Sequence, residues 1–212
     1  HRQSSAASDV YKRQAISSLL NDKVAFKNVI ANGLVLDKDG NKMSKRLGNA
    51  INPFEIIKKY GPDATRWYMI SNANPWDNLK FDANGILDVQ RKFFGTLANT
   101  YSFFALYANL DEFNFKETNL AVSEKTESDL WIISRLNSIA REVDLYYDDY
   151  EPTKAARTIQ SFAVNDLSNW YVRLNRKRFW IGDYNPNKEV AYQTLYTCLN
   201  TIAQLMAPIA PF

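Results

Sequence analysis

Residues 151–181 read EPTKAARTIQSFAVNDLSNWYVRLNRKRFWI and predict one long helix. Pro152 lies near its start, where a proline suits the first helical turn because its missing N–H is not needed there. At about 100° per residue, apolar side chains recur along one face of this helix. We assign that face to a protein core, with Trp170 among its members: Ile159, Ala163, Leu167, Trp170, Leu174 and Ile181.

Three further stretches in the second part of the chain carry apolar residues at helical spacing. They cover residues 83–108, 124–147 and 187–206, and the last of them ends at Ala207-Pro208. Hardly any strand signal lies among them, so the four helices predict an all-α bundle. We place the domain boundary near Pro75 and expect no strand beyond about residue 85.

The residues before the bundle predict a small α/β part. Residues 28–36 are β-branched and apolar around Asn32-Gly33, which indicates a strand, a turn and a strand. A tight turn at residues 37–40 and a polar loop at residues 41–50 follow. Asn52-Pro53 starts one short helix, which ends at Gly61, and Pro62 opens a second. We expect residues 72–82 to be a loop, and residues 1–14 to be a disordered or non-native tail, since they have no apolar face to bury.

Residues 42–46 (KMSKR) lie on the polar loop just before a helix. Two lysines three residues apart can reach two sides of one polyphosphate. A compact ammonium group also suits phosphate oxygens whose charge grows during a reaction. The alternative is an ordinary solvated basic loop, and these five residues alone favour that alternative.

A second face of the 151–181 helix carries polar, basic and aromatic side chains at spacing i, i+4, i+7 and i+11. A basic and aromatic row beside a core face suits phosphates and unstacked bases. The alternative is a solvated face whose arginines pair with local carboxylates, and for any single arginine it has at least equal weight. The presence of Trp180 in this row favours the RNA-binding interpretation. The residues are Asn169, Arg173, Arg176 and Trp180, with Lys177 beside them.

Composition narrows the classes of function further. A formal net charge of +3 fits a nucleic-acid partner without requiring one. Cys198 is the only cysteine and His1 the only histidine, so the sequence predicts neither a disulfide framework nor a zinc or other metal site. No apolar run reaches the roughly 18 residues of a membrane span. We therefore expect a cytoplasmic protein with no membrane partner.

Residues 33–49, with Asn52-Pro53 and residues 59–66, closely resemble the second signature of class I aminoacyl-tRNA synthetases. The family motif ends in Ser, and Arg46 departs from it as a subset of isoleucyl members does. In the family, the two lysines stabilise the pyrophosphate leaving group while the amino-acid carboxylate attacks the α-phosphate of ATP. The resemblance therefore implies catalytic roles for Lys42 and Lys45. It implies an ATP-binding set of Lys42, Met43, Ser44 and Lys45, in which Ser44 positions the loop and Met43 anchors it by packing.

Residues 166–180 resemble the helix typical of the anticodon-binding domain shared by isoleucyl, valyl and leucyl members. Together the two matches imply the C-terminal end of a class I nucleotide-binding α/β catalytic domain (15–75), followed by an all-α anticodon-binding bundle (76–212). The overall look of residues 42–49 and 166–180 favours the isoleucyl branch. For the intact enzyme this implies isoleucine, ATP with Mg²⁺, and tRNA(Ile). The implied tRNA-binding residues are Asn169, Arg173, Arg176, Lys177 and Trp180.

Class I chemistry also needs a first signature that contains histidine, and no histidine follows His1. We therefore expect a fragment of a longer ligase that is inactive alone and contributes the pyrophosphate-binding loop and tRNA-binding helices. Two alternatives stay open. One is a fragment of a valyl or leucyl enzyme, because the discriminating amino-acid pocket is expected upstream. The other is a non-catalytic helical RNA-binding module, against which the pyrophosphate-binding loop argues.

Overall fold

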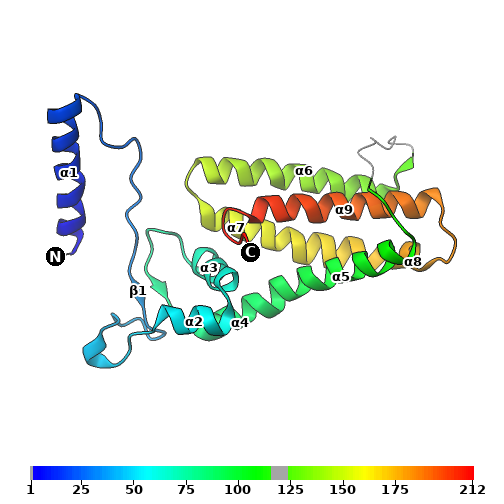
Figure 1. Cartoon of the computed structure of the whole chain (residues 1–212), viewed down its shortest axis with the longest axis horizontal. Helices are drawn as coiled ribbons and strands as arrows, with labels where there is room; N and C mark the ends of the chain where they lie inside the picture. The colour runs from blue at the N-terminus through cyan, green and yellow to red at the C-terminus, as the bar shows by residue number, and fades with distance from the viewer. Residues whose placement is uncertain (1, 116–123) are drawn as a thin grey trace.

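The computed structural model describes residues 2–115 and 124–212, with side chains from residue 9 onward. Figure 1 shows an elongated helical bundle, a smaller part at one end that carries the KMSKR loop, and a helix that stands apart from both. This agrees with the expected fold class, which is mainly α with a small α/β part ahead of a bundle.

The helix that stands apart is α1 (Arg2–Asn21), and it corrects the expectation of a disordered tail over residues 1–14. Residues 2–21 contain neither glycine nor proline and are rich in Ala, Gln, Arg and Leu, which favour helix. Within the part of this segment whose side chains the structure describes, residues 9–14, Tyr11 is 63% exposed.

The strand–turn–strand unit predicted over residues 28–36 is wrong. Only β1 (Val35–Leu36) is a strand there, and it pairs in parallel with β2 (Leu79–Lys80). Gly33 makes no reversal. A Cβ on it would lie 2.0 Å from the carbonyl oxygen of Asp77, so the glycine is needed for close backbone approach.

Most of the loop predicted over residues 72–82 is irregular, but Asn72 ends α3 and residues 79–80 form β2, which lies beyond Pro75, where the sequence places the boundary. The backbone N–H of Leu79 donates to the Leu34 carbonyl, and that of Phe81 to the Leu36 carbonyl, both at 2.9 Å. These bonds tie residues 79–81 to the loop-bearing part.

The two short helices after the loop form as the sequence predicts. They are α2 (Pro53–Tyr60) and α3 (Pro62–Asn72). The Asn52 side chain caps α2 by accepting from the backbone N–H of Phe54 at 3.1 Å. Gly61 ends α2 with a positive φ of 82°. A small apolar cluster beneath these helices consists of Tyr60, Ala64, Tyr68, Leu79, Phe81 and Ile86.

The bundle is built from four helical rods, as predicted. The first comprises α4 (Ala83–Val89), the π segment η2 (Gln90–Phe94) and α5 (Gly95–Leu110). The second is α6 (Glu127–Asp148). The third comprises α7 (Pro152–Ser161), the π segment η4 (Phe162–Val172) and α8 (Arg173–Trp180), and the fourth is α9 (Pro186–Met206). Among the described residues, no strand follows β2.

The π segment η4 changes which side chains of the third rod are buried. Ile159, Ala163 and Leu167 lie in the core as predicted, but the prediction for the rest of that face is wrong. A π segment has more residues per turn than an α-helix, so residues four apart stay on one face. The core therefore continues through Tyr171, Asn175 and Phe179, while Trp170, Leu174 and Ile181 are exposed.

Polar contacts from α7 fix the bundle to α3. The Arg157 guanidinium donates from Nε to the Ser71 carbonyl (2.8 Å) and from Nη2 to the Asn72 carbonyl (3.0 Å). These carbonyls close α3, where a cation is favoured. The indole N–H of Trp67 donates to the Gln160 side chain at 3.0 Å. The position of the KMSKR loop is therefore linked to the third rod of the bundle.

Candidate functional site

The base of the KMSKR loop is closed by the Asn49 side chain. Its Nδ2 donates to Asp37 Oδ2 at 2.9 Å and to the Lys42 carbonyl at 3.3 Å, and its Oδ1 accepts from the Ser44 backbone N–H at 2.8 Å. Hydrogen bonds from the Asn49 side chain and the Asn41 backbone hold the pKa of Asp37 below its ordinary value. One amide thus joins the turn before the loop to the loop itself.

Ser44 and Met43 shape the loop in different ways. Ser44 caps the 3-10 turn η1 (Lys45–Leu47), its Oγ accepting from the backbone N–H of Leu47 at 3.2 Å. Gly48 ends that turn in the left-handed region, with a φ of 67°. Met43 is half-buried and packs on the small apolar cluster under α2 and α3. Ser44 thus holds the turn and Met43 packs against the cluster, and a contact of either residue with ATP stays a prediction.

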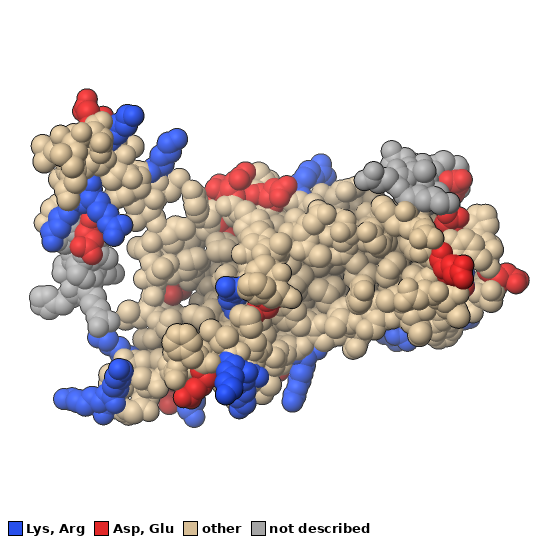
Figure 2. Space-filling model, in the orientation of Figure 1, with Lys and Arg blue, Asp and Glu red and all other residues tan. Residues whose placement is uncertain are grey.

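The two lysines project from this fixed base. Lys42 pairs through its backbone with Leu36, and Lys45 opens η1, yet both side chains are exposed. Neither forms an ion pair with any part of the chain that the structure describes. Figure 2 shows basic side chains gathered at the loop-bearing end of this view. Two free ammonium groups on a short, braced loop can bind a polyphosphate.

The predicted RNA-binding row is exposed on the third rod: Asn169, Arg173, Arg176, Lys177 and Trp180. Arg173, Arg176 and Lys177 have no ion-pair partner among residues 9–115 and 124–212. The alternative, in which the arginines of this helix pair with local carboxylates, applies to Arg178 instead. The row therefore presents unpaired positive charge and an exposed indole to solvent.

A buried polar network between the third rod and α6 is not predicted by the sequence. Arg178 Nη1 donates to Asp129 Oδ1 at 2.8 Å, and the Tyr171 hydroxyl donates to the same oxygen at 2.6 Å. Burial raises the pKa of Asp129, but hydrogen bonds from Arg178, Tyr171 and Thr126 outweigh it and lower the pKa overall. Thr126 and Asp129 form a capping box, whose T-x-x-D spacing is the signal that could have revealed Asp129.

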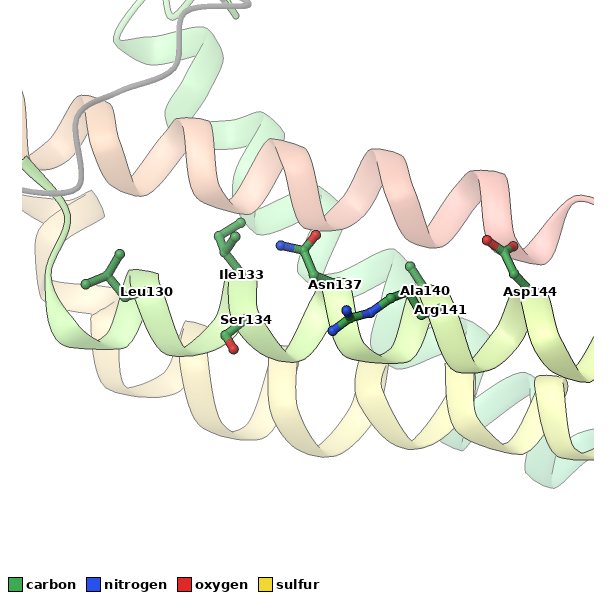
Figure 3. A pocket seen from close by; sticks show the side chains of 7 residues that line it. All are labelled: Leu130, Ile133, Ser134, Asn137, Ala140, Arg141 and Asp144. Carbon is green, nitrogen blue, oxygen red and sulfur yellow. The ribbon is translucent and has the colours of Figure 1, made fainter.

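Two hollows lie outside these sites. A groove of about 690 Å³ lies along α6 and is lined by mixed apolar and polar side chains, from Leu130 to Asp144. Figure 3 shows these side chains on the helix. A second hollow of about 620 Å³ lies between Gly61 at the start of α3 and Met206 at the end of α9. In the part of the chain that the structure describes, no three His, Cys, Asp or Glu side chains could hold a metal ion.

Within residues 2–115 and 124–212, no helix combines the length and the apolar character that crossing a membrane requires.

Two family models match the chain, one on each part. Residues 9–82 match class I tRNA synthetases (I, L, M and V), and residues 129–212 match the anticodon-binding domain of tRNA ligases. The first match covers the KMSKR loop, and the second covers the basic row.

Curated relatives cover nearly the whole chain. The chain is 72% identical to the isoleucine–tRNA ligase of Cytophaga hutchinsonii over 198 residues. These residues make up 93% of this chain and 18% of that protein. The chain is 64% identical to the isoleucine–tRNA ligase of Bacteroides fragilis over the same share of this chain and 17% of that protein. The chain thus spans about a fifth of the length of these relatives.

Solved structures share the fold at lower identity. The LeuRS of Agrobacterium radiobacter K84, in its ternary complex with tRNA and LeuAMS, superimposes with a TM-score of 0.70 at 18% identity, covering 95% of this chain and 24% of that one. The methionyl-tRNA synthetase of Mycobacterium tuberculosis bound by methionyl-adenylate gives 0.67 at 19% identity, covering 85% and 35%. The two family matches and the 72% identity over 93% of this chain show that it belongs to the class I tRNA synthetases, as part of their isoleucine–tRNA ligase branch.

Proposed function

We propose that this chain forms the part of an isoleucine–tRNA ligase in which Lys42 and Lys45 bind the pyrophosphate that leaves ATP when isoleucine is activated. One observation carries the proposal: both ammonium groups are exposed and unpaired among the described residues, on a loop whose base Asn49 and Asp37 hold closed. The 72% identity to an isoleucine–tRNA ligase supports isoleucine over valine or leucine.

The chemistry requires charge to be stabilised where it grows. When the isoleucine carboxylate attacks the α-phosphate, negative charge builds on the leaving pyrophosphate. Two ammonium groups therefore gain more interaction energy in the transition state than with bound ATP. Bracing of the loop lowers the cost of holding both lysines in place. Magnesium is expected with ATP in the intact enzyme.

The tRNA(Ile) partner is proposed for the bundle. The row of Asn169, Arg173, Arg176, Lys177 and Trp180 would contact the phosphate backbone through its basic members, which makes binding sensitive to salt. The chain alone should bind tRNA weakly and catalyse nothing, since nothing in it is assigned to adenine or isoleucine. A cytoplasmic location stays a prediction.

We also propose that the loop-bearing part ends near residue 82 rather than at Pro75. The parallel pairing of β1 with β2 and the first family match, which ends at residue 82, both support that limit.

The test replaces the matched 198 residues of the Cytophaga hutchinsonii enzyme with those of this chain. In that hybrid, Lys42→Ala and Lys45→Ala should each lower isoleucine-dependent pyrophosphate exchange by about 10²–10³-fold, with little change in isoleucine affinity. Lys38→Ala is the matched control, because Lys38 is an exposed lysine on the neighbouring turn. Equal exchange rates in all three variants would remove the lysines from the reaction.

A further inference from the structure

Two exposed tryptophans meet on the outer surface of the bundle. Trp131 lies on α6 and Trp170 on η4, with ring centroids 6.3 Å apart and planes inclined by 58°. Trp131 is 37% exposed and Trp170 is 55% exposed. The π register of η4 turns Trp170 outward, away from the core face to which helical periodicity assigns it.

Polar contacts across the two helices fix this pair in place. Arg135, one turn beyond Trp131, forms an ion pair of 3.1 Å with Asp166, which lies one turn before Trp170. In the other direction, the Ser128 hydroxyl donates to the Asn175 side chain at 3.1 Å. The two indoles therefore lie between two cross-helix contacts on antiparallel helices, and holding them there needs little additional ordering.

The surroundings of the pair are basic and partly apolar. Arg173 and Leu174 follow Trp170 by three and four residues, so both lie next to it on the helix surface. Leu174 is exposed, and Arg173 has no ion-pair partner within the described residues. Two acidic groups lie near the pair: Asp166, which is paired with Arg135, and the exposed Glu127, one turn before Trp131 on α6. The aromatic pair thus adjoins the unpaired positive charge of Arg173, Arg176 and Lys177.

The exposed indole pair can serve as a binding surface for another molecule. Each indole offers a flat face on which a base can stack, and stacking tolerates any base because every base has a π-face. Arginines alongside can bind the phosphates that connect successive bases. A protein partner would instead favour an apolar centre depleted of charge, and this surface carries several unpaired cations.

We propose that Trp131 and Trp170 form a stacking platform for unstacked bases of a single-stranded RNA segment whose phosphates lie along Arg173 and Arg176. This rests on the proposed function, which supplies tRNA as the partner, and it names the part of the bundle that receives unpaired nucleotides. Double-stranded RNA cannot use the platform, because its bases are stacked on one another.

The experiment measures binding of a short single-stranded RNA and of a matched RNA duplex to the purified chain by fluorescence anisotropy. Trp170→Leu and Trp131→Leu should each weaken single-strand binding by about 5- to 150-fold, the range for loss of one stacked base. Duplex binding should change little. Trp170→Phe keeps an aromatic ring and should retain most of the affinity.

Trp76→Leu is the matched control, because Trp76 is also exposed (48%) but lies just before β2, in the loop-bearing part. It should leave single-strand binding unchanged. Thermal melting of each variant checks that the bundle is folded. Base stacking should also quench tryptophan fluorescence in the parent chain, and less so in Trp170→Leu.

Two outcomes separate this proposal from the proposed function. Suppose RNA binding falls with salt and Arg173→Ala/Arg176→Ala lowers the salt slope by about 1 to 2. If neither Trp→Leu variant then weakens single-strand binding, the platform is wrong and the tRNA-binding bundle stands. Equal losses for single strand and duplex also overturn the platform. If the parent chain binds no RNA at any salt concentration, the tRNA role itself fails, and a protein partner for the tryptophans becomes the better explanation.

Discussion

The bundle and the loop-bearing part are stabilised by different kinds of interaction. The bundle surrounds one large apolar cluster that reaches from Trp67 on α3 to Ile209. The loop-bearing part has a small cluster, while Phe54 and Leu47 are 79% and 66% exposed. Its shape depends instead on hydrogen bonds such as those of Asn49.

Because of this difference, the two parts should respond differently to substitutions. In the bundle, burial of many side chains fixes the fold, and the candidate RNA-binding groups project outward from a rigid frame. In the loop-bearing part, a few polar contacts set the loop geometry, so one substitution can alter the loop without unfolding the chain. Variants in the two parts should therefore give global and local effects, respectively.

The largest effect is expected from breaking the buried pair of Asp129 and Arg178. Asp129→Ala leaves the Arg178 guanidinium without its carboxylate partner, and its side chain is only 11% exposed. We expect a loss of about 3–5 kcal/mol in the free energy of unfolding, measured by urea denaturation. Asp88→Ala, which removes the exposed pair with Lys92, is the control and should cost at most about 1 kcal/mol.

Asp129 should also make the stability of the bundle fall as the pH is lowered. Because the folded-state pKa of Asp129 is lowered, its contribution is present above the unfolded pKa of about 3.9. That contribution is lost as pH falls through the folded pKa. In Asp129→Asn, stability measured over acid pH should therefore fall less steeply than in the parent chain. An identical acid profile would show that other carboxylates dominate.

The contrast between the two parts also explains what the sequence could predict. Four helical rods follow from apolar periodicity, because each buries one stripe of side chains. The exposure of Trp170 could not be predicted, because a π segment shifts the register and no residue pattern marks it. The sequence predicts too long a strand before β1, because several residues between 28 and 34 are apolar and β-branched. The true limits of β1 depend on its pairing partner, which lies more than forty residues away at Leu79.

The candidate sites divide in the same way. Lys42 and Lys45 could be proposed from the resemblance over residues 33–66, because the five residues of the loop alone favour an ordinary solvated loop. Asn49 is the last residue of the 33–49 match, and its bonds to Asp37 and Ser44 form only in the folded loop. The Arg178 network joins residues far apart in the sequence, so only Thr126 and Asp129, three residues apart, could be paired in advance.

A smaller, local effect is expected from Gly33→Ala. The new Cβ would meet the backbone carbonyl of Asp77 at 2.0 Å, and backbone cannot yield as a flexible side chain can. We expect the β1–β2 pairing to lose about 1–3 kcal/mol, the usual cost of overpacking. Hydrogen exchange of the Leu79 and Phe81 amides should speed up while bundle amides keep their rates.

Gly182→Ala provides the control for that variant, because nothing lies within 4 Å of its added Cβ. It should leave exchange unchanged at both amides. Equal acceleration of hydrogen exchange throughout the bundle in Gly33→Ala would mean that the two parts unfold as one unit, and that the loop-bearing part is not separately stabilised.

The smallest effect on stability is expected from Asn49→Ala, which removes hydrogen bonds to Asp37, Ser44 and the Lys42 carbonyl. None of these contacts is fully buried, so each should contribute about 1 kcal/mol. The melting temperature of the bundle should hardly change. The Ser44 amide, which loses its acceptor, should exchange about 5- to 30-fold faster, as a local change of one or two kcal/mol implies.

Asn49→Asp separates the two functions of this amide. It keeps an oxygen to accept from Ser44 N–H but loses the donor, and it sets a second carboxylate against Asp37. The pKa of Asp37 should rise, which NMR titration of its carboxyl carbon would detect. In the hybrid ligase, both variants should lower pyrophosphate exchange less than Lys42→Ala does, because the lysines remain but are less well held. Pyrophosphate exchange at the parent rate in Asn49→Ala would show that the lysines do not depend on the hydrogen bonds of Asn49. The loop-bearing part would then tolerate loss of its polar contacts as well as the bundle tolerates changes at its surface.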